Sequence, residues 1–496
     1  MNIRDLLSAL SHYTQVFPNI EAQLESVNAD AMNLEITSIE HDSRKVGPGS
    51  LFVAIEGTEF DSHSKISEAK DKGVSFVIGS KKYNDQIPDL IVEDSRAVLG
   101  PLSARLHSDI SQKMKLVGVT GTNGKTTVTY LYAGMIRAHQ ESCFTMGTTG
   151  VLVDNVKQFD SQTTPDPLLI QSYFQNFYDD GIVNGVMEVS SHALEQLRVL
   201  GTNFAAVAFT NFSQDHLDYH LNMESYFLAK AKLFSTMYSP TAVINLDDEK
   251  SHEIIQIAKN NGQEIITVSN KENSADIYIK TLSSSLNSSE LEIFIDNHSY
   301  YLITDIVGDY NFENIAVALG LSYAVGNDIE KSIEALKSPD IAPGRLQRVP
   351  GSNNFSVFVD YAHTPDSLKR VIDVVKPLAK RTVVVFGCGG DRDRAKRPIM
   401  GSIAKTNADI AIVTSDNPRS ENPKTIIDEI VQGDESLIVI EDRKQAIAYA
   451  LKNAENGDAI IIAGKGHEEG QIFADRVEEF SDIKVASECL KELNGV

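Results

Sequence analysis

The stretch from Lys115 to Thr127 constrains the fold of this chain more than any other. An apolar, β-branched run ends in a glycine-rich turn, and helix-forming residues follow from Val128 to Arg137. A strand, a tight loop and a helix N-terminus in this order surround a polyphosphate with backbone N–H groups. The stretch therefore predicts an α/β domain that binds a nucleotide.

The loop is a shortened form of the usual phosphate-binding loop. The common spacing requires glycine at position 119, where this chain has valine, so Gly121 opens the turn instead. Lys125 is expected to reach the β- and γ-phosphates, and the Thr126 hydroxyl to hold Mg²⁺. The predicted nucleotide contacts of the loop are Gly121, Thr122, Asn123, Gly124, Lys125, Thr126 and Thr127.

Length, charge and cysteine content limit the class of protein. A chain of 496 residues is expected to form about three domains. The net charge of −24 argues against nucleic-acid binding, which requires a basic surface. Three widely separated cysteines fit a reducing compartment, and neither a signal peptide nor a membrane-spanning run is recognised. We therefore expect a cytoplasmic, soluble protein with no membrane partner.

The hydrophobic pattern divides the chain into three α/β domains. Residues 1–112 predict a small module with short strands near Leu51–Ile55, Val74–Ile78 and Leu90–Val92. Residues 113–340 predict a parallel sheet that carries the phosphate loop, followed by antiparallel hairpins between Ala275 and Ile306. Residues 341–496 alternate strand and helix five times, as in a doubly wound, Rossmann-like domain.

Two further strands of the central domain end in residues that suit a metal site. Glu188 ends one strand, and His216 follows another. Ligands collect outside the carboxyl ends of strands in open α/β sheets, and a carboxylate there suits Mg²⁺. The alternatives are a helix-capping role for Glu188 and a structural role for His216.

Two helical segments carry polar residues whose roles the pattern leaves open. Lys230 and Lys232 cannot share a helix face at a spacing of two, so one is expected to point to solvent and the other inward. Asn311 and Asn314 begin a later helix. Their amides suit the edge of an adenine, and helix capping is the alternative.

Four strands of the third domain are followed by polar loops. These loops begin at Asp360, Gly387, Ser415 and Gly464. Because the strands are expected to be parallel, the four loops are predicted to lie at one edge of the sheet. Taken alone, Arg419 in the third of these loops would be a surface turn residue.

In their order along nearly the whole chain, these motifs resemble the Mur ligase family of ATP-dependent amino-acid ligases. The motifs are Gly121-Thr-Asn-Gly-Lys-Thr-Thr127, Glu188-Val-Ser-Ser-His192, Asn211–Asp218, Asn311-Phe-Glu-Asn314, Gly344-Arg345-Leu, Asp360–Pro365 and Gly389–Asp393. The resemblance implies that ATP phosphorylates a substrate carboxylate and that an amine then displaces the phosphate.

The resemblance also implies roles for individual residues. It implies catalytic roles for Lys125, Glu188, His216 and a Lys230 that is carbamylated by CO₂, and Mg²⁺ ligation by Thr126, Glu188, His216 and Lys230. It implies ATP contacts at Asn311, Asn314, Arg345 and Asp360 in addition to the phosphate loop. For a UDP-N-acetylmuramoyl-L-alanyl-D-glutamate substrate it implies contacts at Ser43, Gln162, Thr163, Thr164, Ser190, Gln196 and Arg198.

The resemblance further implies which amino acid is added. Members of the family that add the third residue use meso-diaminopimelate or L-lysine, which differ by one carboxylate. A guanidinium suits that extra carboxylate. The motif at 416–419 favours diaminopimelate, with implied contacts at Arg392, Asp416, Asn417, Pro418, Arg419, Gly464 and Glu468.

Several alternatives remain at this stage. They are a lysine-adding ligase, a P-loop ATPase without ligase activity, a folylpolyglutamate synthase and a non-catalytic nucleotide-binding protein. Small molecules are the only expected partners, and the chain is expected to be a monomer.

Overall fold

The computed structural model describes residues 1–57, 60–351 and 354–494, except for the side chain of Asp218. The chain forms two compact units, which are described separately below. One unit contains Met1–Val268 and Val317–Ser332, and the other contains Ser269–Ala316 and Ile333–Val496. Parallel sheets with helices between the strands confirm the predicted α/β class. The domain boundaries at 112/113 and 340/341 stay predictions.

The first unit begins with the small module that the sequence predicts. Its four strands are all parallel, and β2 and β3 are buried along their whole length. Because both faces are covered, these strands read as continuous apolar runs. The elements are β1 (Ser38–Glu40), β2 (Ser50–Val53), β3 (Phe76–Gly79) and β4 (Leu90–Ile91), with helices α1 (Ile3–Leu7), α2 (Ile20–Glu25), α3 (Ile66–Asp71) and α4 (Leu99–Leu106).

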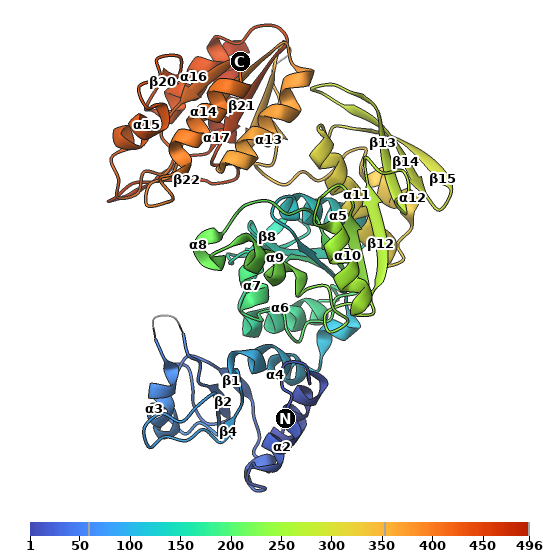
Figure 1. Ribbon diagram of the computed structural model, residues 1–496, viewed down its shortest axis with the longest axis vertical. Helices are drawn as coiled ribbons and strands as arrows, with labels where there is room; N and C mark the ends of the chain where they lie inside the picture. The colour runs from blue at the N-terminus through green and yellow to red at the C-terminus, as the bar shows by residue number, and fades with distance from the viewer. Residues whose placement is uncertain (58–59, 352–353, 495–496) are drawn as a thin grey trace. The chain divides into compact units, whose positions relative to one another are not determined.

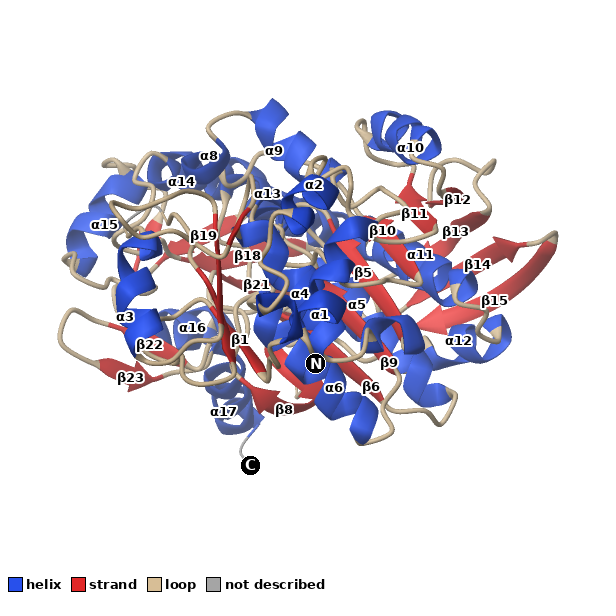
Figure 2. Ribbon diagram, turned by 90° about the horizontal axis from the view of Figure 1, so that it is seen from below, coloured by secondary structure: helices blue, strands red, loops and turns tan. Residues whose placement is uncertain are grey.

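The same unit contains a larger sheet around the phosphate loop. Its strand order is β12-β11-β10-β5-β9-β6-β7-β8, parallel from β12 to β6 and antiparallel from β6 to β8. Figure 2 shows β5, β9 and β6 side by side. The strands are β5 (Lys115–Thr120), β6 (Cys143–Gly147), β7 (Gly150–Val153), β8 (Val156–Phe159), β9 (Asn184–Glu188), β10 (Ala206–Phe209), β11 (Thr241–Asn245) and β12 (Glu264–Ser269).

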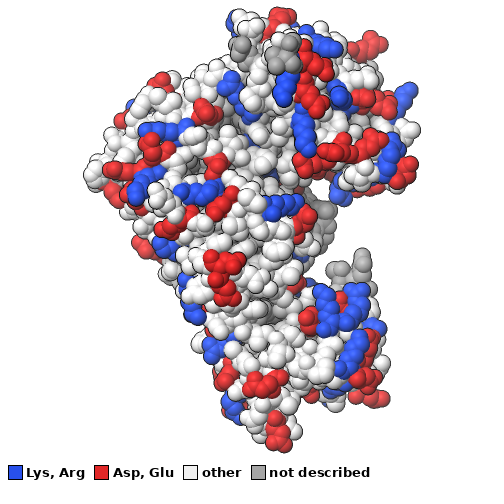
Figure 3. Space-filling view, turned by 180° about the vertical axis from the view of Figure 1, so that it is seen from behind, with Lys and Arg blue, Asp and Glu red and all other residues white. Residues whose placement is uncertain are grey.

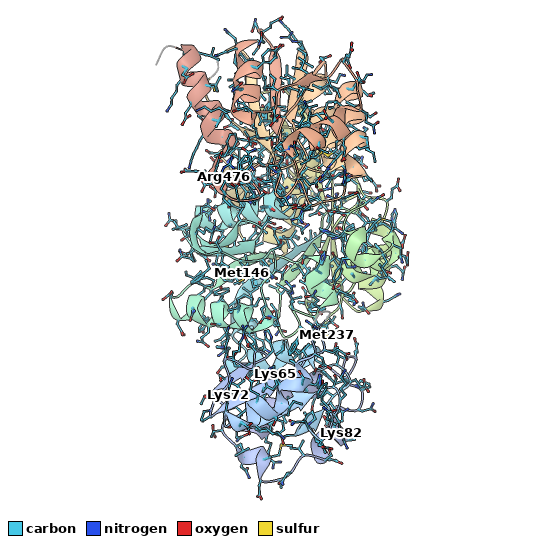
Figure 4. The ribbon with its side chains drawn as sticks, turned by 90° about the vertical axis from the view of Figure 1, so that its left-hand side faces the viewer. Lys65, Lys72, Lys82, Met146, Met237 and Arg476 are labelled. Atoms are coloured by element: carbon cyan, nitrogen blue, oxygen red, sulfur yellow. The ribbon has the colours of Figure 1, made fainter. Side chains whose placement is uncertain are left out.

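Helices cover this sheet, and its interior is apolar. Met146 of β6, labelled in Figure 4, is fully buried in the core. Figure 1 labels the helices α5 (Lys125–Ala138), α6 (Pro167–Asp179), α7 (Ser191–Glu195), α8 (Leu217–His220), α9 (Met223–Ala231) and α10 (Ser251–Asn260), and later in the chain α11 (Asp309–Ala324) and α12 (Ile329–Ala335).

The predicted strand, loop and helix at the phosphate loop are confirmed as β5 and α5. Gly121 has a φ of +145°, and a Cβ on it would lie 1.9 Å from Oγ1 of Thr210. Gly124 has a φ of +86° and directly precedes α5. Only glycine fits at position 121, because a side chain there would collide with Thr210, which directly follows β10.

The second unit contains an antiparallel hairpin pair and the doubly wound sheet. The hairpin strands are β13 (Ile277–Ser284), β14 (Ser289–Ile295) and β15 (His298–Thr304). The sheet order is β16-β17-β21-β18-β19-β20, parallel except for β16. Its strands are β16 (Gln347–Arg348), β17 (Ser356–Asp360), β18 (Arg381–Phe386), β19 (Ile410–Val413), β20 (Ile438–Val439) and β21 (Asp458–Ala463).

Five helices and a short hairpin complete this unit. They are α13 (Pro365–Val375), α14 (Lys396–Asn407), α15 (Pro423–Val431), α16 (Arg443–Lys452) and α17 (Asp482–Asn494), with β22 (Gly470–Ile472) and β23 (Val477–Glu479). Since β17, β21, β18 and β19 are parallel neighbours, their four polar loops lie at one edge of the sheet, as predicted.

The surface is polar, with both signs of charge present. On the face shown in Figure 3, acidic and basic side chains are interspersed. Among the helices of the described residues, none combines the length and apolar character needed to cross a membrane.

Candidate active site

Two lysines converge on the phosphate loop. The ammonium groups of Lys125 and Lys230 each donate to the carbonyl oxygen of Gly121 at 2.8 Å, and Lys125 also donates to that of Thr122 at 2.9 Å. Lys230 comes from α9 and is 1% exposed, whereas Lys232 is 41% exposed and pairs with Glu195. Lys230 is therefore the inward member of the pair. Burial, and then the charge of Lys125, hold the pKa of Lys230 well below its usual value.

A buried carboxylate lies beside the start of α5. Oγ1 of Thr126 donates to Oε1 of Glu188 at 2.9 Å, and Thr148 donates its backbone N–H to the same oxygen at 2.9 Å and its hydroxyl to Oε2 at 3.2 Å. Glu188 is 1% exposed. Ser190, rather than Glu188, caps α7, so the capping interpretation of Glu188 is wrong.

The close approach of Gly147 to Glu188 gives a direct test of this carboxylate. A Cβ at position 147 would lie 2.2 Å from Oε1 of Glu188. We expect Gly147→Ala to push the carboxylate away from Thr126 and to raise the Mg²⁺ concentration needed for ATP turnover roughly tenfold, since crowding a buried site costs about 1–3 kcal/mol. Gly47→Ala, with nothing within 4 Å of its Cβ, is the matched control. A Mg²⁺ titration that is unchanged in Gly147→Ala would separate Glu188 from the metal.

His216 lies near the two lysines, within a cluster of aromatic rings. It precedes α8 with a φ of 52°, and its ring centroid is 4.9 Å from that of His192 and 6.0 Å from that of Tyr226. Burial is the main cause that lowers the pKa of His216. A neutral imidazole can ligate a metal ion.

The donor set fits Mg²⁺ better than a metal held by protein alone. No group of three or more His, Cys, Asp or Glu side chains suited to a metal occurs in the part of the chain that the structure describes. Mg²⁺ usually binds one or two carboxylates, keeps several waters and takes phosphate oxygens from the nucleotide. Thr126 and Glu188 supply hydroxyl and carboxylate oxygens of this kind.

A second site in the first unit is a cavity of 390 Å³ between the small module and the larger sheet. The small module contributes His41, Ile55, Arg96 and Leu99, and the region of the larger sheet contributes Gln162, Asp166, Gln196 and Arg198 among others. Nε2 of His41 and Oδ2 of Asp166 are 3.2 Å apart, and this hydrogen bond is the main cause that raises the pKa of His41.

Arg198 joins most of the predicted substrate residues into one network. It donates to the side-chain oxygens of Gln162 and Gln196 and, at 2.8 Å, to the carbonyl oxygen of Thr164. The Thr164 hydroxyl accepts the backbone N–H of Ser190 at 3.0 Å. Ser43 lies outside the cavity lining, and its carbonyl accepts from Lys72, which Figure 4 labels. Thr163 is half-buried beside Thr164.

The predicted adenine-side residues lie in the second unit. Asn311 donates to the carbonyl of Val307 at 3.0 Å, and Asn314 donates to Oδ1 of Asn311 at 3.3 Å. Both residues lie within α11, so neither is its N-cap. The Asp360 carboxylate accepts the backbone N–H groups of Leu346 at 2.6 Å and Ala362 at 2.8 Å, and burial raises its pKa.

An aromatic contact connects the loop that follows Asp360 at the end of β17 with the loop after β21, which contains Glu468. The Arg345 guanidinium lies 4.7 Å from the ring centroid of Tyr361, and that ring is 5.3 Å from the ring of His467. His467 directly precedes Glu468. Arg345, predicted to contact ATP, is therefore linked through two aromatic rings to the loop that contains Glu468, predicted to contact the amino acid.

The structure brings together the residues predicted to bind diaminopimelate, the amino acid that accepts the acyl group and is called the acceptor below. Nη1 of Arg419 donates to the carbonyl of Gly390 at 2.7 Å, and a Cβ on Gly389 would lie 2.9 Å from Nη1 of Arg419 and 3.7 Å from Cγ of Arg392. Two guanidinium side chains thus flank one glycine. Asp416 and Gly464 are also close, since a Cβ on Gly464 would lie 2.6 Å from Oδ2 of Asp416. The carbonyl of Pro418 packs still more closely on Gly390.

A buried lysine that the sequence reasoning missed holds the remaining acceptor residues. Lys465, fully buried, donates to Oδ1 of Asn417 at 2.8 Å and to Oε2 of Glu468 at 3.2 Å. Asn417 donates its amide to the same Glu468 oxygen at 2.7 Å. The lysine fixes which way the amide of Asn417 faces, and its only sequence signal is its place between Gly464 and Gly466.

Arg397 was also missed, and it joins two of the acceptor loops. Its fully buried guanidinium donates to Glu421 at 2.8 and 2.9 Å and to the carbonyl of Gly389 at 3.2 Å. Glu421 in turn accepts the backbone N–H of Asp391 at 2.6 Å. The pKa of Glu421 falls to about 2, mainly through the bond from Arg397. Because the contacts with Glu421 span more than twenty residues, no local pattern indicates them.

Comparison with known families identifies the class. Three segments match family models, namely the Mur ligase middle domain at residues 119–322, the Mur ligase glutamate ligase domain at 344–466 and the Mur ligase family catalytic domain at 35–106. The chain belongs to the Mur ligase family.

Individual relatives are more specific. The chain is 40% identical over 474 residues to the UDP-N-acetylmuramoyl-L-alanyl-D-glutamate–2,6-diaminopimelate ligase of Listeria monocytogenes serotype 4b, covering 93% of this chain and 96% of the relative. It is also similar to a solved structure of a ligase of that name, at 33% identity and a TM-score of 0.71, covering 92% and 95%. The MurF ligase of Thermotoga maritima, solved with ADP, shares the fold at 19% identity and a TM-score of 0.57, covering 93% and 98%.

Proposed function

We propose that this chain catalyses the ATP-dependent addition of meso-2,6-diaminopimelate to UDP-N-acetylmuramoyl-L-alanyl-D-glutamate. The observation that carries the proposal is the cluster of residues predicted to bind the amino acid, where the side chains of Arg392 and Arg419 flank Gly389 and Asn417 donates to Glu468. Relatives named for this reaction align along nearly the whole chain. The alternatives of a non-ligase ATPase and of a folylpolyglutamate synthase lack that support.

The reaction brings two anions, the substrate carboxylate and ATP, together before the amine reacts. ATP transfers its γ-phosphoryl group to the substrate carboxylate, which gives an acyl phosphate and ADP, and the amine of the amino acid then displaces phosphate to form the amide. Lys125 neutralises charge on the phosphates, and the backbone N–H groups of the loop hold them. The cavity that contains Arg198 orients the nucleotide-sugar substrate.

Mg²⁺ belongs to this proposal as the ion held by Thr126 and Glu188, with His216 and a carbamylated Lys230 serving a second position. The ion supplies charge neutralisation between carboxylate and triphosphate. Burial lowers the pKa of Lys230 and so favours the neutral amine, which is the form that reacts with CO₂. A carbamate on Lys230 would supply a carboxylate-like oxygen in place of a positive charge.

The acceptor pocket distinguishes diaminopimelate from lysine by charge. Arg419 and Arg392 offer guanidinium groups for the two carboxylates of diaminopimelate, whereas lysine has only one carboxylate. Glu468 offers an anion for an ammonium group, held in place by Lys465 and Asn417. These small molecules are the partners, and the chain is proposed to act in the cytoplasm as a monomer.

Phosphate release tests the proposed function. With ATP, Mg²⁺ and UDP-N-acetylmuramoyl-L-alanyl-D-glutamate present, release is expected to require meso-diaminopimelate and to be far slower with L-lysine. Release that is indifferent to any amino acid would point to an ATPase, and release that prefers lysine would transfer the chain to the lysine-adding group.

A further inference from the structure

Two arginines of the substrate cavity donate hydrogen bonds to neutral oxygens. Arg96 and Arg198 both line the cavity of 390 Å³. All hydrogen bonds of Arg198 go to neutral oxygens of Gln162, Thr164 and Gln196, and Arg96 donates to the carbonyl of Glu56 at 3.3 Å. Within the described residues, neither guanidinium forms a salt bridge.

The carboxylates that line the cavity form ion pairs with residues other than these two arginines. Asp166 pairs with His41, and Asp160, which is 92% exposed, pairs with Lys157. The two half-buried guanidinium groups thus donate hydrogen bonds to neutral oxygens, and the charge of Asp166, which is shared with His41, is the carboxylate charge that acts on Arg198. Burial is the main cause that lowers the pKa of Arg198; the charge of Asp166 opposes this shift, and the charge of Arg96 adds to it. A site of this kind favours an anionic ligand, because unpaired charge is costly to remove from water.

The position of Arg96 is fixed by its backbone. It begins the short turn before α4, where its N–H donates to Oδ1 of Asp94 at 2.9 Å. Its neighbours Ala97 and Val98 are fully buried, and the hydroxyl of Ser95 donates to the carbonyl of Ala54 at 2.5 Å. The guanidinium is therefore presented to the cavity from a rigid support.

We infer that Arg96 and Arg198 together bind one anionic group of the nucleotide-sugar substrate, which makes Arg96 a substrate-binding residue of the small module. This inference rests on the proposed function, because that substrate carries both a diphosphate and the carboxylates of its glutamyl end. A guanidinium fork suits either group. The diphosphate and the carboxylates are both anions that arginine binds, and the choice of probe in the titration distinguishes them.

Equilibrium titration of the full chain tests the assignment. The chain is first saturated with a non-hydrolysable ATP analogue, so that the phosphate loop is occupied. The probes are the UDP-N-acetylmuramoyl dipeptide, UDP and inorganic pyrophosphate. We expect Arg96→Gln to weaken binding of the nucleotide-sugar at least about tenfold, the usual effect of losing one charged hydrogen bond, and Arg96→Lys to retain part of the affinity.

Arg105→Gln is the matched control, since Arg105 lies on α4 of the same module and pairs with Asp109 at 2.9 Å. The affinity of the Arg105→Gln variant for the nucleotide-sugar is expected to stay unchanged. Equal midpoints of thermal unfolding for all variants exclude misfolding. Parallel loss of UDP binding in Arg96→Gln assigns the diphosphate, and intact UDP binding assigns a carboxylate.

The outcomes separate this inference from the proposed function. Unchanged nucleotide-sugar affinity in Arg96→Gln overturns the role of Arg96 and leaves the proposed function standing. If the native chain binds neither UDP ligand but binds pyrophosphate, and Arg96→Gln loses that binding, the anion site stands and the proposed function falls. If the native chain binds none of the probes, both are overturned.

Discussion

Replacing Lys125 by methionine is expected to lower acceptor-dependent phosphate release roughly 100- to 1000-fold. Lys125 is the charged side chain that the phosphate loop itself carries, and its ammonium lies at the mouth of that loop on the carbonyls of Gly121 and Thr122. Removing one preorganised donor from a site where charge develops has effects of this size. The measurement is the rate of phosphate release at saturating ATP and acceptor.

Lys115→Met provides the matched control for this variant. Lys115 begins β5, the strand that leads into the phosphate loop, at the end opposite to that loop, and its side chain is exposed. Its substitution also replaces one lysine by methionine, so the rate of this variant is expected to stay within about twofold of the native chain, as is usual for surface changes. A Lys125→Met enzyme that keeps most of its activity would remove the phosphate loop from the reaction.

The second large effect is expected at Arg419. Arg419→Ala removes the guanidinium beside Gly389 while leaving the nucleotide residues in place. Losing a charged hydrogen bond costs about 1.5–3 kcal/mol, so kcat/KM for diaminopimelate is expected to fall roughly 10- to 100-fold. Binding of ATP is expected to change less than about twofold, because the Arg419 guanidinium donates to Gly390, which is not among the residues predicted to contact ATP.

Two comparisons make the Arg419 result specific. Arg476→Ala, labelled in Figure 4, removes an arginine that is 52% exposed and pairs with Asp475 and Glu478, and its kinetics are expected to match the native chain. L-Lysine as acceptor is expected to lose much less than diaminopimelate in Arg419→Ala, since it has no second carboxylate. Equal losses for ATP and diaminopimelate would place Arg419 outside the acceptor pocket.

Features encoded in short stretches of sequence were predictable. The run from Lys115 to Thr120 became β5, and α5 begins at Lys125, as the glycine-rich turn indicates. The hairpins of β13, β14 and β15 follow the alternation between Ala275 and Ile306. In these places the local preference and the tertiary environment agree.

Features that depend on distant partners were not predictable. The strands β6, β7 and β8 were not anticipated, because the run beginning at Cys143 is short and contains Gly147 and Gly150, residues that disfavour strands. Lys230 could not be distinguished from Lys232 by pattern, since its burial is set by α9 packing near Gly121. Thr148, Lys465 and Arg397 act through contacts with residues far away in the sequence or on another loop.

The most direct test of the central claim follows the oxygen atoms of the substrate carboxylate. If ATP phosphorylates the glutamyl carboxylate, one oxygen of that group must leave with the phosphate when the amine attacks. With the reacting carboxylate labelled by ¹⁸O and diaminopimelate as acceptor, mass spectrometry is expected to find one labelled oxygen in each phosphate released. Phosphate that carries no label, released while the amide product accumulates, would contradict an acyl-phosphate ligase.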